Sequence, residues 1–204
     1  MKSTRLKSII EGEMLVGASE MTQRFQHLRG FNLLPKDKGQ SARDLSPDEI
    51  VSGIISVMDV RPGYAGLIVT CTKSLKPVRG INYSYRGAKT LGEVMCLLLD
   101  NPDDLVELKI KGIENDDRGI PSYAYGGRAQ ISYKEDGDEK TSYYVPKTSL
   151  SLFGETSQDA IDYDPRKFKA QFEREYVLKG NIFRNIHNYL KQENKHKEIM
   201  KDLS

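Results

Sequence analysis

Residues 13–50, EMLVGASEMTQRFQHLRGFNLLPKDKGQSARDLSPDEI, are the stretch of this chain that says most about its fold. The spacing of its apolar residues predicts a helix over residues 19–29 with one buried face. That apolar stripe consists of Met21, Phe25 and Leu28. Gly17 breaks the pattern before this segment, Ser19 can cap it, and Gly30 is a typical C-terminal stop. The segment is therefore predicted to be an amphipathic helix between two turns.

Two further helices are predicted on either side of this one. Apolar residues recur at helical spacing over residues 4–15. Residues 46–49, SPDE, match a capping box with proline at the first helical position, so a third helix is expected to begin there. The loop before it, residues 36–45, is polar and basic. This order is that of a winged helix-turn-helix, which places one helix in the major groove of DNA.

The same stretch resembles the N-terminal module of MerR-like winged helix-turn-helix regulators over about residues 13–50. The chain also resembles a set of small proteins of alphaproteobacterial genomes and prophages, mostly of unassigned function. Those proteins share an LLPKGKG-like loop before a capped helix and a later GAxTLGE segment. Here the two segments stand as LLPKDKG, residues 33–39, and GAKTLGE, residues 87–93.

The resemblance implies that Ser19–Arg29 is the recognition helix. Glutamine and arginine make bidentate contacts with adenine and guanine edges, and loop cations contact phosphate or the minor groove. The implied DNA-binding residues are Thr22, Gln23, Arg24, Gln26, His27 and Arg29 of the helix, and Lys36, Lys38 and Arg43 of the loop. For Arg24 and Arg29 a surface salt bridge is the alternative, and for His27 it is packing or solvation.

The charge of the chain is unevenly distributed. The net charge of the 204 residues is +2, but residues 1–90 carry +6 and residues 91–204 carry −4. A basic first half suits a module that contacts phosphates. No apolar run approaches the roughly 20 residues of a membrane span, and residues 1–13 lack the apolar core of a signal peptide. We therefore expect no membrane partner and a cytoplasmic protein, with the two cysteines as buried free thiols.

The second half of the chain predicts a mixed structure. Thr90 can cap an apolar helix over residues 91–100, and residues 105–113 alternate like a strand. A hairpin is expected over residues 128–146, with its turn at residues 135–138. A fourth strand is expected around residues 149–153.

The chain from Pro165 onward is predicted to be helical, with an interruption at Gly180-Asn181 and a frayed charged tail over residues 191–204. Its apolar stripe consists of Phe168, Phe172, Tyr176, Ile182, Phe183, Ile186, Tyr189 and Leu190. That stripe could form a homodimer, or it could pack on the sheet within one chain.

These elements predict an α+β protein of two domains. A helical, winged helix-turn-helix domain is expected over residues 1–78. A small domain with an antiparallel sheet and flanking helices is expected over residues 79–204, for dimerisation or partner binding. The boundary is placed at residues 76–80, where proline and glycine interrupt the apolar pattern.

Tyrosines and acidic residues of the second half suggest other possible functions. Tyr83, Tyr85, Tyr123, Tyr125, Tyr133, Tyr143 and Tyr144 gather around the hairpin with Arg86 and Arg128. They could stack on bases or contact a protein, and strand packing is the alternative. The carboxylates Asp103, Asp104 and Glu107 near a strand start are weak candidates for metal-dependent cleavage.

We therefore expect sequence-specific binding of double-stranded DNA by a transcriptional regulator of the phage or prophage type. No catalytic step, metal or cofactor is expected. The alternative is a phage-encoded inhibitor or adaptor, anti-CRISPR-like, that retains the helix-turn-helix and acts through its second domain on a protein partner.

Overall fold

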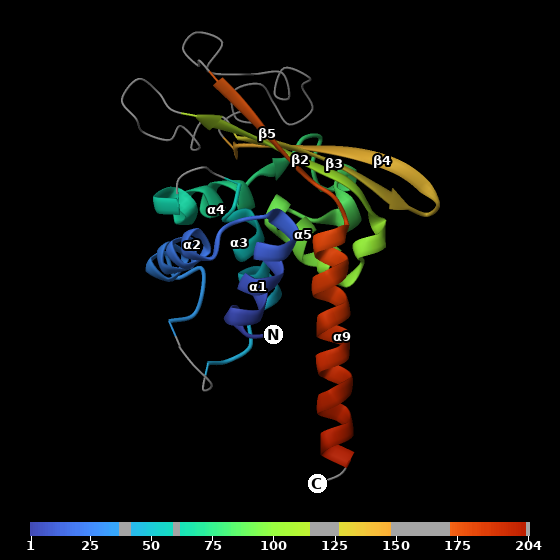
Figure 1. The fold of residues 1–204 in the computed structure, drawn as a ribbon. Coiled ribbons are helices and arrows are strands. Elements are labelled where there is room, and N and C mark those ends of the chain that lie inside the picture. The colour runs from blue at the N-terminus through green and yellow to red at the C-terminus, as the bar shows by residue number, and fades with distance from the viewer. Residues whose placement is uncertain (37–41, 59–61, 115–126, 148–171, 203–204) are drawn as a thin grey trace.

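A computed structural model describes residues 1–36, 42–58, 62–114, 127–147 and 172–202 of the chain (Figure 1). The fold is α+β, as the sequence predicts: helices lie on one face of a five-stranded antiparallel sheet with the order β1-β4-β3-β2-β5. In the described ranges no helix is both long and apolar enough to cross a membrane.

The helices are α1 (Ser3–Met14), α2 (Ala18–Gly30), α3 (Pro47–Ile55), α4 (Ala65–Lys73), α5 (Leu91–Asp100) and α9 (Asn181–Asp202). The short 3₁₀ helices are η1 (Pro62–Tyr64), η2 (Ile81–Tyr83), η3 (Tyr85–Gly87) and η4 (Pro102–Asp104). The strands are β1 (Lys76–Pro77), β2 (Leu105–Glu114), β3 (Arg128–Glu135), β4 (Asp138–Val145) and β5 (Phe172–Leu178).

The sheet has one buried face because its side chains alternate in register. Leu178, Leu108, Ile131 and Ser142 lie in one row across four strands and are all buried. The adjacent row belongs to the other face and consists of Val177, Lys109, Gln130 and Tyr143. A one-residue shift would exchange the two rows, so the apolar pattern fixes the register.

The predicted hairpin is confirmed, and the residues of its turn explain why the loop is so short. Glu135 pairs with Asp138, which leaves a two-residue loop. Asp136 and Gly137 both have positive φ, 56° and 89°. A type I′ turn needs positive φ at both central positions, and its twist matches that of the flanking strands.

The C-terminal segment is only partly as predicted. Residues 172–178 form strand β5, paired with β2 from Leu108↔Leu178 to Glu114↔Phe172, so the expected helix is wrong there. Residues that are four apart share a face in either element, so the spacing of Phe172 and Tyr176 fits both. The remaining expected helix, residues 165–171, and the strand expected at residues 149–153 lie outside the described residues.

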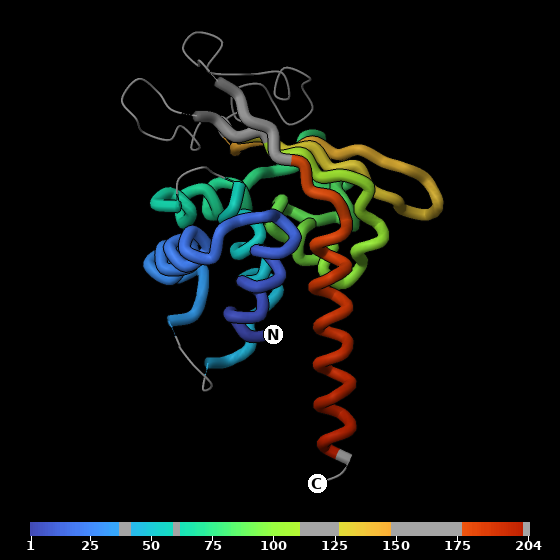
Figure 2. The backbone as a smooth tube through the Cα atoms, viewed as in Figure 1, coloured from blue at the N-terminus to red at the C-terminus, as the bar shows by residue number. Residues whose placement is uncertain are grey.

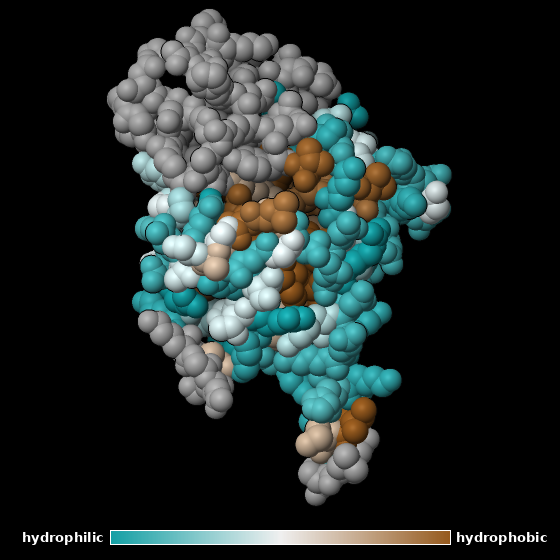
Figure 3. All heavy atoms as spheres, viewed as in Figure 1, coloured by the Kyte–Doolittle hydropathy of each residue, from teal (hydrophilic) through white to brown (hydrophobic). Residues whose placement is uncertain are grey.

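The last helix, α9, is longer than expected and leaves the body of the protein. It runs to Asp202 in place of a frayed tail, and its far half projects away from the other helices (Figure 2). Ile182, Phe183 and Ile186 are buried within the chain, which supports internal packing for this part of the stripe. At the free end, apolar Ile199 and Met200 are about half exposed (Figure 3).

The predicted domain boundary, residues 76–80, begins with a strand of the sheet. Lys76 and Pro77 form the edge strand β1, paired with Val145 and Tyr144 of β4. Buried side chains from both sides of this point form one cluster, from Leu6 in α1 to Ile186 in α9. The described part of the chain therefore has one continuous core where the sequence predicted two domains.

Candidate functional site

The helix predicted to read DNA, α2, is present with its expected stripe. Met21, Phe25 and Leu28 are at most 2% exposed. Its first residue is Ala18, preceded by Gly17 at the N-cap position, so the expected cap by Ser19 is not formed. The turn before it contains Leu15 at φ 54°. The helix is thus fixed by packing, while its helix-turn-helix identity stays a prediction.

The outer face of α2 is polar. Thr22, Gln23, Gln26 and His27 are exposed. The Thr22 hydroxyl donates to the Ala18 carbonyl at 2.8 Å and accepts from Lys7 Nζ at 2.6 Å. Within the described part of the chain, no hydrogen bond engages the amides of Gln23 and Gln26. These groups are therefore available to a ligand.

Arg24 was expected on this outer face, and that prediction is wrong. Its side chain is 1% exposed. Nε donates to Glu20 Oε1 at 2.9 Å, and Nη1 donates to the Ser56 carbonyl at 2.5 Å. Position 24 lies three residues after Met21, so it belongs to the edge of the buried stripe. Arg24 joins α2 to the C-terminus of α3 and cannot contact DNA in this arrangement.

The other predicted cations differ in their availability. Arg29 is half-buried, and its Nε donates to the Pro35 carbonyl at 3.2 Å. Lys36 is exposed. Arg43 is exposed but binds both carboxylate oxygens of Glu49, at 2.8 and 2.5 Å. This contact keeps the pKa of Glu49 below its ordinary value despite partial burial.

The predicted loop that carries these cations is only partly described. Lys38 lies outside the described residues, and residues 42–46 contain no strand. This end of the loop is fixed by α9: Lys197 Nζ contacts Asp44 Oδ2 at 2.7 Å. That hydrogen bond is the main reason why the pKa of Asp44 is lowered to about 2. The loop is therefore fixed at its C-terminal end, where residues 42–46 precede α3.

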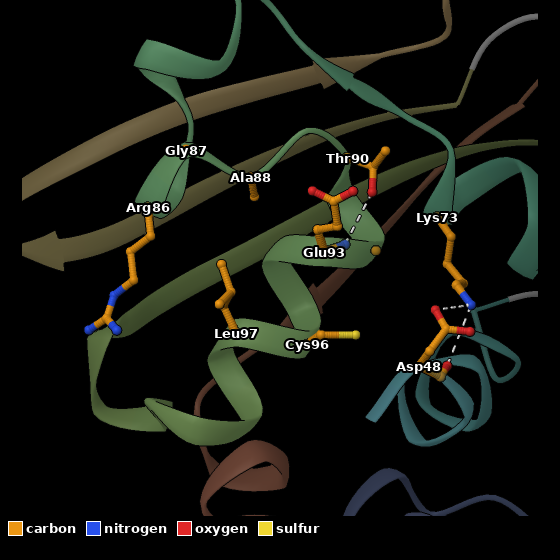
Figure 4. Close-up of a pocket in the computed structure, with 10 residues that line it drawn as sticks. Asp48, Lys73, Arg86, Gly87, Ala88, Thr90, Glu93, Cys96 and Leu97 are labelled. Atoms are coloured by element: carbon orange, nitrogen blue, oxygen red, sulfur yellow. Dashed lines mark hydrogen bonds and ion pairs between the residues drawn. The ribbon is translucent and has the colours of Figure 1, made fainter. Parts of the chain in front are cut away.

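A second feature of the described residues is a charged pocket between α3, α4, α5 and η3 (Figure 4). Its volume is about 600 Å³. The lining consists of Asp48, Lys73, Arg86, Gly87, Ala88, Thr90, Gly92, Glu93, Cys96 and Leu97. Five of these belong to the GAKTLGE segment, residues 87–93. That segment carries part of the resemblance noted in the sequence, and the resemblance implies no role for it.

Charged side chains of the pocket are held by specific contacts. Lys73 Nζ lies 2.5 Å from Asp48 Oδ1 and 3.1 Å from the Ser52 hydroxyl. Across the pocket, Arg86 Nη2 contacts Asp104 Oδ2 at 2.9 Å. Glu93 lies in the first turn of α5, where its backbone N–H donates to the Thr90 hydroxyl at 3.2 Å. Thr90 thus caps the helix, as predicted.

The pocket is built on a close approach of α4 to α5. A Cβ added at Gly92 would lie 3.1 Å from Lys73 Cβ and 3.3 Å from the Lys73 carbonyl oxygen. Glycine at position 92 therefore lets the Lys73 side chain run along the first turn of α5. The sequence does not reveal this site because Asp48 and Glu93, which both line it, are 45 residues apart in the chain.

The cysteine of the pocket is not a nucleophile at neutral pH. Burial raises the pKa of the Cys96 thiol to about 11, so the thiol stays protonated. The pKa of Cys71 is raised by burial as well. Both cysteines are free and half-buried. The pocket therefore offers charge and hydrogen bonds for binding rather than an activated thiolate.

No protein-family model, curated protein or solved structure matches this chain. The function of the chain is therefore inferred from the geometry of α2 and of the pocket.

Proposed function

We propose that this chain binds double-stranded DNA in a sequence-specific manner through the outer face of α2, and that it is a transcriptional regulator of the phage or prophage type. The observation that carries the proposal is the exposed run of Thr22, Gln23, Gln26 and His27 on a helix whose opposite face is buried. Glutamine amides suit adenine edges, and threonine can contact a thymine methyl. No carboxylate stands among these four positions.

The flanking cations support the same role. Lys7 of α1 reaches the edge of this face through its contact with Thr22, and Lys36 lies beyond the other end of α2. Such side chains position a protein on phosphates without reading sequence. With Lys7, Lys36 and the half-buried Arg29 as the cations that flank the face, we expect log K to fall with log salt with a slope on the order of −3 per protomer.

The rigid attachment of α2 also supports a reading role. Arg24 ties the helix to the carbonyl of Ser56, and its apolar stripe packs on the other helices. A recognition helix must present its side chains in a fixed register. Binding energy is then not lost in ordering the helix.

The test begins with DNA sequences selected by the protein from a random duplex library at about 50 mM salt, a concentration that preserves phosphate contacts. Gln23→Ala and Gln26→Ala are each expected to weaken binding to the selected duplex by about 5- to 100-fold, and to leave random duplex binding unchanged. Lys36→Ala should weaken both equally. Fluorescence anisotropy measures the affinity of the unmodified chain and of each of the three variants for both duplexes.

The matched control is Gln192→Ala, which removes an exposed glutamine of α9. Its affinity for the selected duplex should equal that of the unmodified chain. The proposal fails if selection enriches no sequence, or if Gln23→Ala and Gln26→Ala behave like the control.

A second candidate function is protein binding at the β1–β4 edge of the sheet. Tyr83 is 59% exposed, Ile81 47% and Tyr143 37%. The Val78 N–H donates to the Tyr143 carbonyl at 2.8 Å, and the Ser142 hydroxyl donates to the Tyr83 carbonyl at 2.5 Å, so the segments are held together. Exposed aromatic residues are enriched at protein interfaces. This surface favours the alternative of a phage-encoded, anti-CRISPR-like inhibitor or adaptor.

The two functions respond to different variants. A Tyr83→Ser, Tyr143→Ser double variant should abolish co-purification with a host nucleic-acid-binding complex and keep the affinity for selected DNA. The Gln23→Ala, Gln26→Ala double variant should instead lose the repression of a reporter gene that carries the selected sequence. If the tyrosine variant keeps its partner, the second candidate is rejected.

A further inference from the structure

The pocket between α3, α4 and α5 is separate from the proposed DNA contact. Its volume of about 600 Å³ is in the range of small-molecule sites, on the order of 300–1,000 Å³. Lys73 and Asp48 lie at one end and Arg86 at the other, with Glu93, Cys96 and Leu97 of α5 between them (Figure 4). The pocket thus has charged ends and a central part that combines a carboxylate with apolar atoms.

The two cations of the pocket are already paired. Lys73 is bound by Asp48 and Ser52. Arg86 is bound by Asp104, and its guanidinium lies 5.3 Å from the ring centroid of Tyr85. An anionic ligand would have to compete with these carboxylates, so the lining does not favour one.

Unlike Lys73 and Arg86, the Glu93 side chain is not held in an ion pair among the described residues. Its Oε2 accepts the Lys89 backbone N–H at 2.7 Å, and within the described ranges no lysine or arginine side chain is paired with it. The remaining carboxylate oxygen can therefore accept a charged donor from a ligand. Such charge-assisted hydrogen bonds are about twice as strong as neutral ones.

The electrostatic field at Cys96 also favours a positive charge in the pocket. Burial is the main cause of the raised pKa of Cys96, but the charges of Asp48, Asp100 and Glu93 raise it further. Lys73 acts in the opposite direction. A field that disfavours a thiolate at this point favours a positive charge.

We propose that this pocket binds a small organic monocation, with its ammonium or guanidinium group at Glu93 and its carbon chain over Ala88, Cys96 and Leu97. Cys96 and Leu97 are only half-buried, so part of their apolar surface faces the pocket. Lys73 and Arg86 are each paired with an aspartate, so among the described lining residues Glu93 offers one carboxylate without a cationic partner, and a second positive charge on the ligand finds no such partner. The site therefore prefers a monocation to a polyamine, and it does not depend on DNA binding.

Butylguanidinium is a suitable probe, with butyrate as the anionic control and spermidine as the polycation. Titration of the ¹⁵N-labelled chain should give saturable amide shifts confined to residues 48, 73 and 86–97. Butylguanidinium should bind tighter than spermidine, and butyrate should give no saturable shift. Because the shifts are mapped on the unmodified chain, this result does not depend on any variant being stable.

Glu93→Gln keeps the size of the side chain and removes its charge. It should weaken butylguanidinium binding by about tenfold or more, as measured by calorimetry. The matched control Glu139→Gln removes an exposed carboxylate of the hairpin and should leave the affinity unchanged. Thermal unfolding of both variants establishes that they are folded.

Several outcomes overturn the proposal. These are equal binding of butyrate, equal affinity in Glu93→Gln, shifts that map elsewhere, or no saturable shift up to about 10 mM, where binding would be negligibly weak. A lysine-containing tripeptide distinguishes the source of the cation. If the tripeptide binds more tightly than butylguanidinium, the site belongs to a partner's side chain rather than to a small molecule.

Discussion

Arg24 is the side chain on which the attachment of α2 to α3 depends. The carbonyl of Ser56 lies at the C-terminal end of α3, where helices leave carbonyls without a partner. Arg24 donates to this carbonyl and is also paired with Glu20 one turn before it. A buried cation is tolerated here because both ends of its guanidinium are hydrogen-bonded.

The variant Arg24→Ala should lower the free energy of unfolding by about 2–3 kcal/mol. It leaves a cavity and an unpaired carbonyl at Ser56, whereas Glu20 is 41% exposed and can be rehydrated. Urea unfolding followed by circular dichroism measures the loss. Gln23→Ala on the outer face should change stability by less than about 0.5 kcal/mol. An equal effect of the two variants would contradict the buried role of Arg24.

The sequence could not assign Arg24 because its helical position lies at the edge of the stripe. Position 24 is three residues after Met21 and four before Leu28, so it faces the core whenever α2 packs on more than one partner. Whether α2 packs on more than one partner depends on η1 and α4, which lie much later in the chain. Thr22, Gln23, Gln26 and His27 are opposite the stripe, and their exposure follows from periodicity alone.

Asp44 makes stability depend on pH in the acidic range. Its pKa is lowered from 3.8 to about 2 in the folded protein, chiefly by the hydrogen bond from Lys197. A lowered pKa means that the carboxylate stabilises the fold above pH 4 and that this contribution is lost as pH falls from about 4 to about 2. Because Asp44 is 37% exposed, the effect should stay below about 1 kcal/mol.

Asp44→Asn should therefore reduce the loss of stability between pH 5 and pH 2.5, and should be less destabilising at pH 2.5 than at pH 5. Urea midpoints at the two pH values measure this difference. A variant that is equally destabilising at both would show that the charge of Asp44 is not involved.

Among the elements, α3 has the most complete start signal in the sequence. The Ser46 hydroxyl accepts the Glu49 N–H at 3.3 Å, and Glu49 Oε2 accepts the Ser46 N–H at 2.8 Å. Pro47 occupies the first helical position, where its missing N–H costs nothing. Local chemistry of this kind is predictable because all partners lie within four residues.

Ser46→Ala should therefore destabilise the protein by about 1 kcal/mol through loss of the cap. Ser19 provides the matched comparison, because it is a serine that the sequence suggested as a cap but that lies inside the first turn of α2. Ser19→Ala should be neutral or slightly stabilising, since alanine has the higher helix propensity. Thermal unfolding of the two variants side by side tests this, and a larger loss for Ser19→Ala would contradict it.

The type of an element could be predicted where its signal was local. The prediction failed where the element depends on residues far away in the chain. The hairpin follows from alternation and from Asp136-Gly137, which accept positive φ. Strand β5 has no such signal, because its pairing with β2 joins residues more than 55 positions apart. The spacing of Phe172 and Tyr176 fits a helix as well as a strand, so the tertiary pairing decides which of the two forms.

At the scale of the whole molecule, the decisive feature is the shared core. Helices α1–α5 and α9 lie on one face of the sheet, and the buried cluster includes side chains from α1, β3 and α9 alike. Residues 76–80, KPVRG, have the composition of a linker. They are instead held at the sheet edge by β4, about 68 residues later, which no local pattern reveals.

A single core predicts a single cooperative unfolding transition. Secondary structure, followed by far-ultraviolet circular dichroism, and tertiary structure, followed by tyrosine fluorescence, should therefore change at the same urea concentration. The chain has 11 tyrosines and no tryptophan, and Tyr85, Tyr133 and Tyr144 lie in the core, so exposure of these three side chains contributes to the fluorescence change. A fragment of residues 1–78 should show no cooperative transition, because it loses the β4 partner of β1 and the α5 and α9 surfaces that cover α3 and α1. Two separate transitions in the full chain, or cooperative folding of the fragment, would instead establish an independent N-terminal domain.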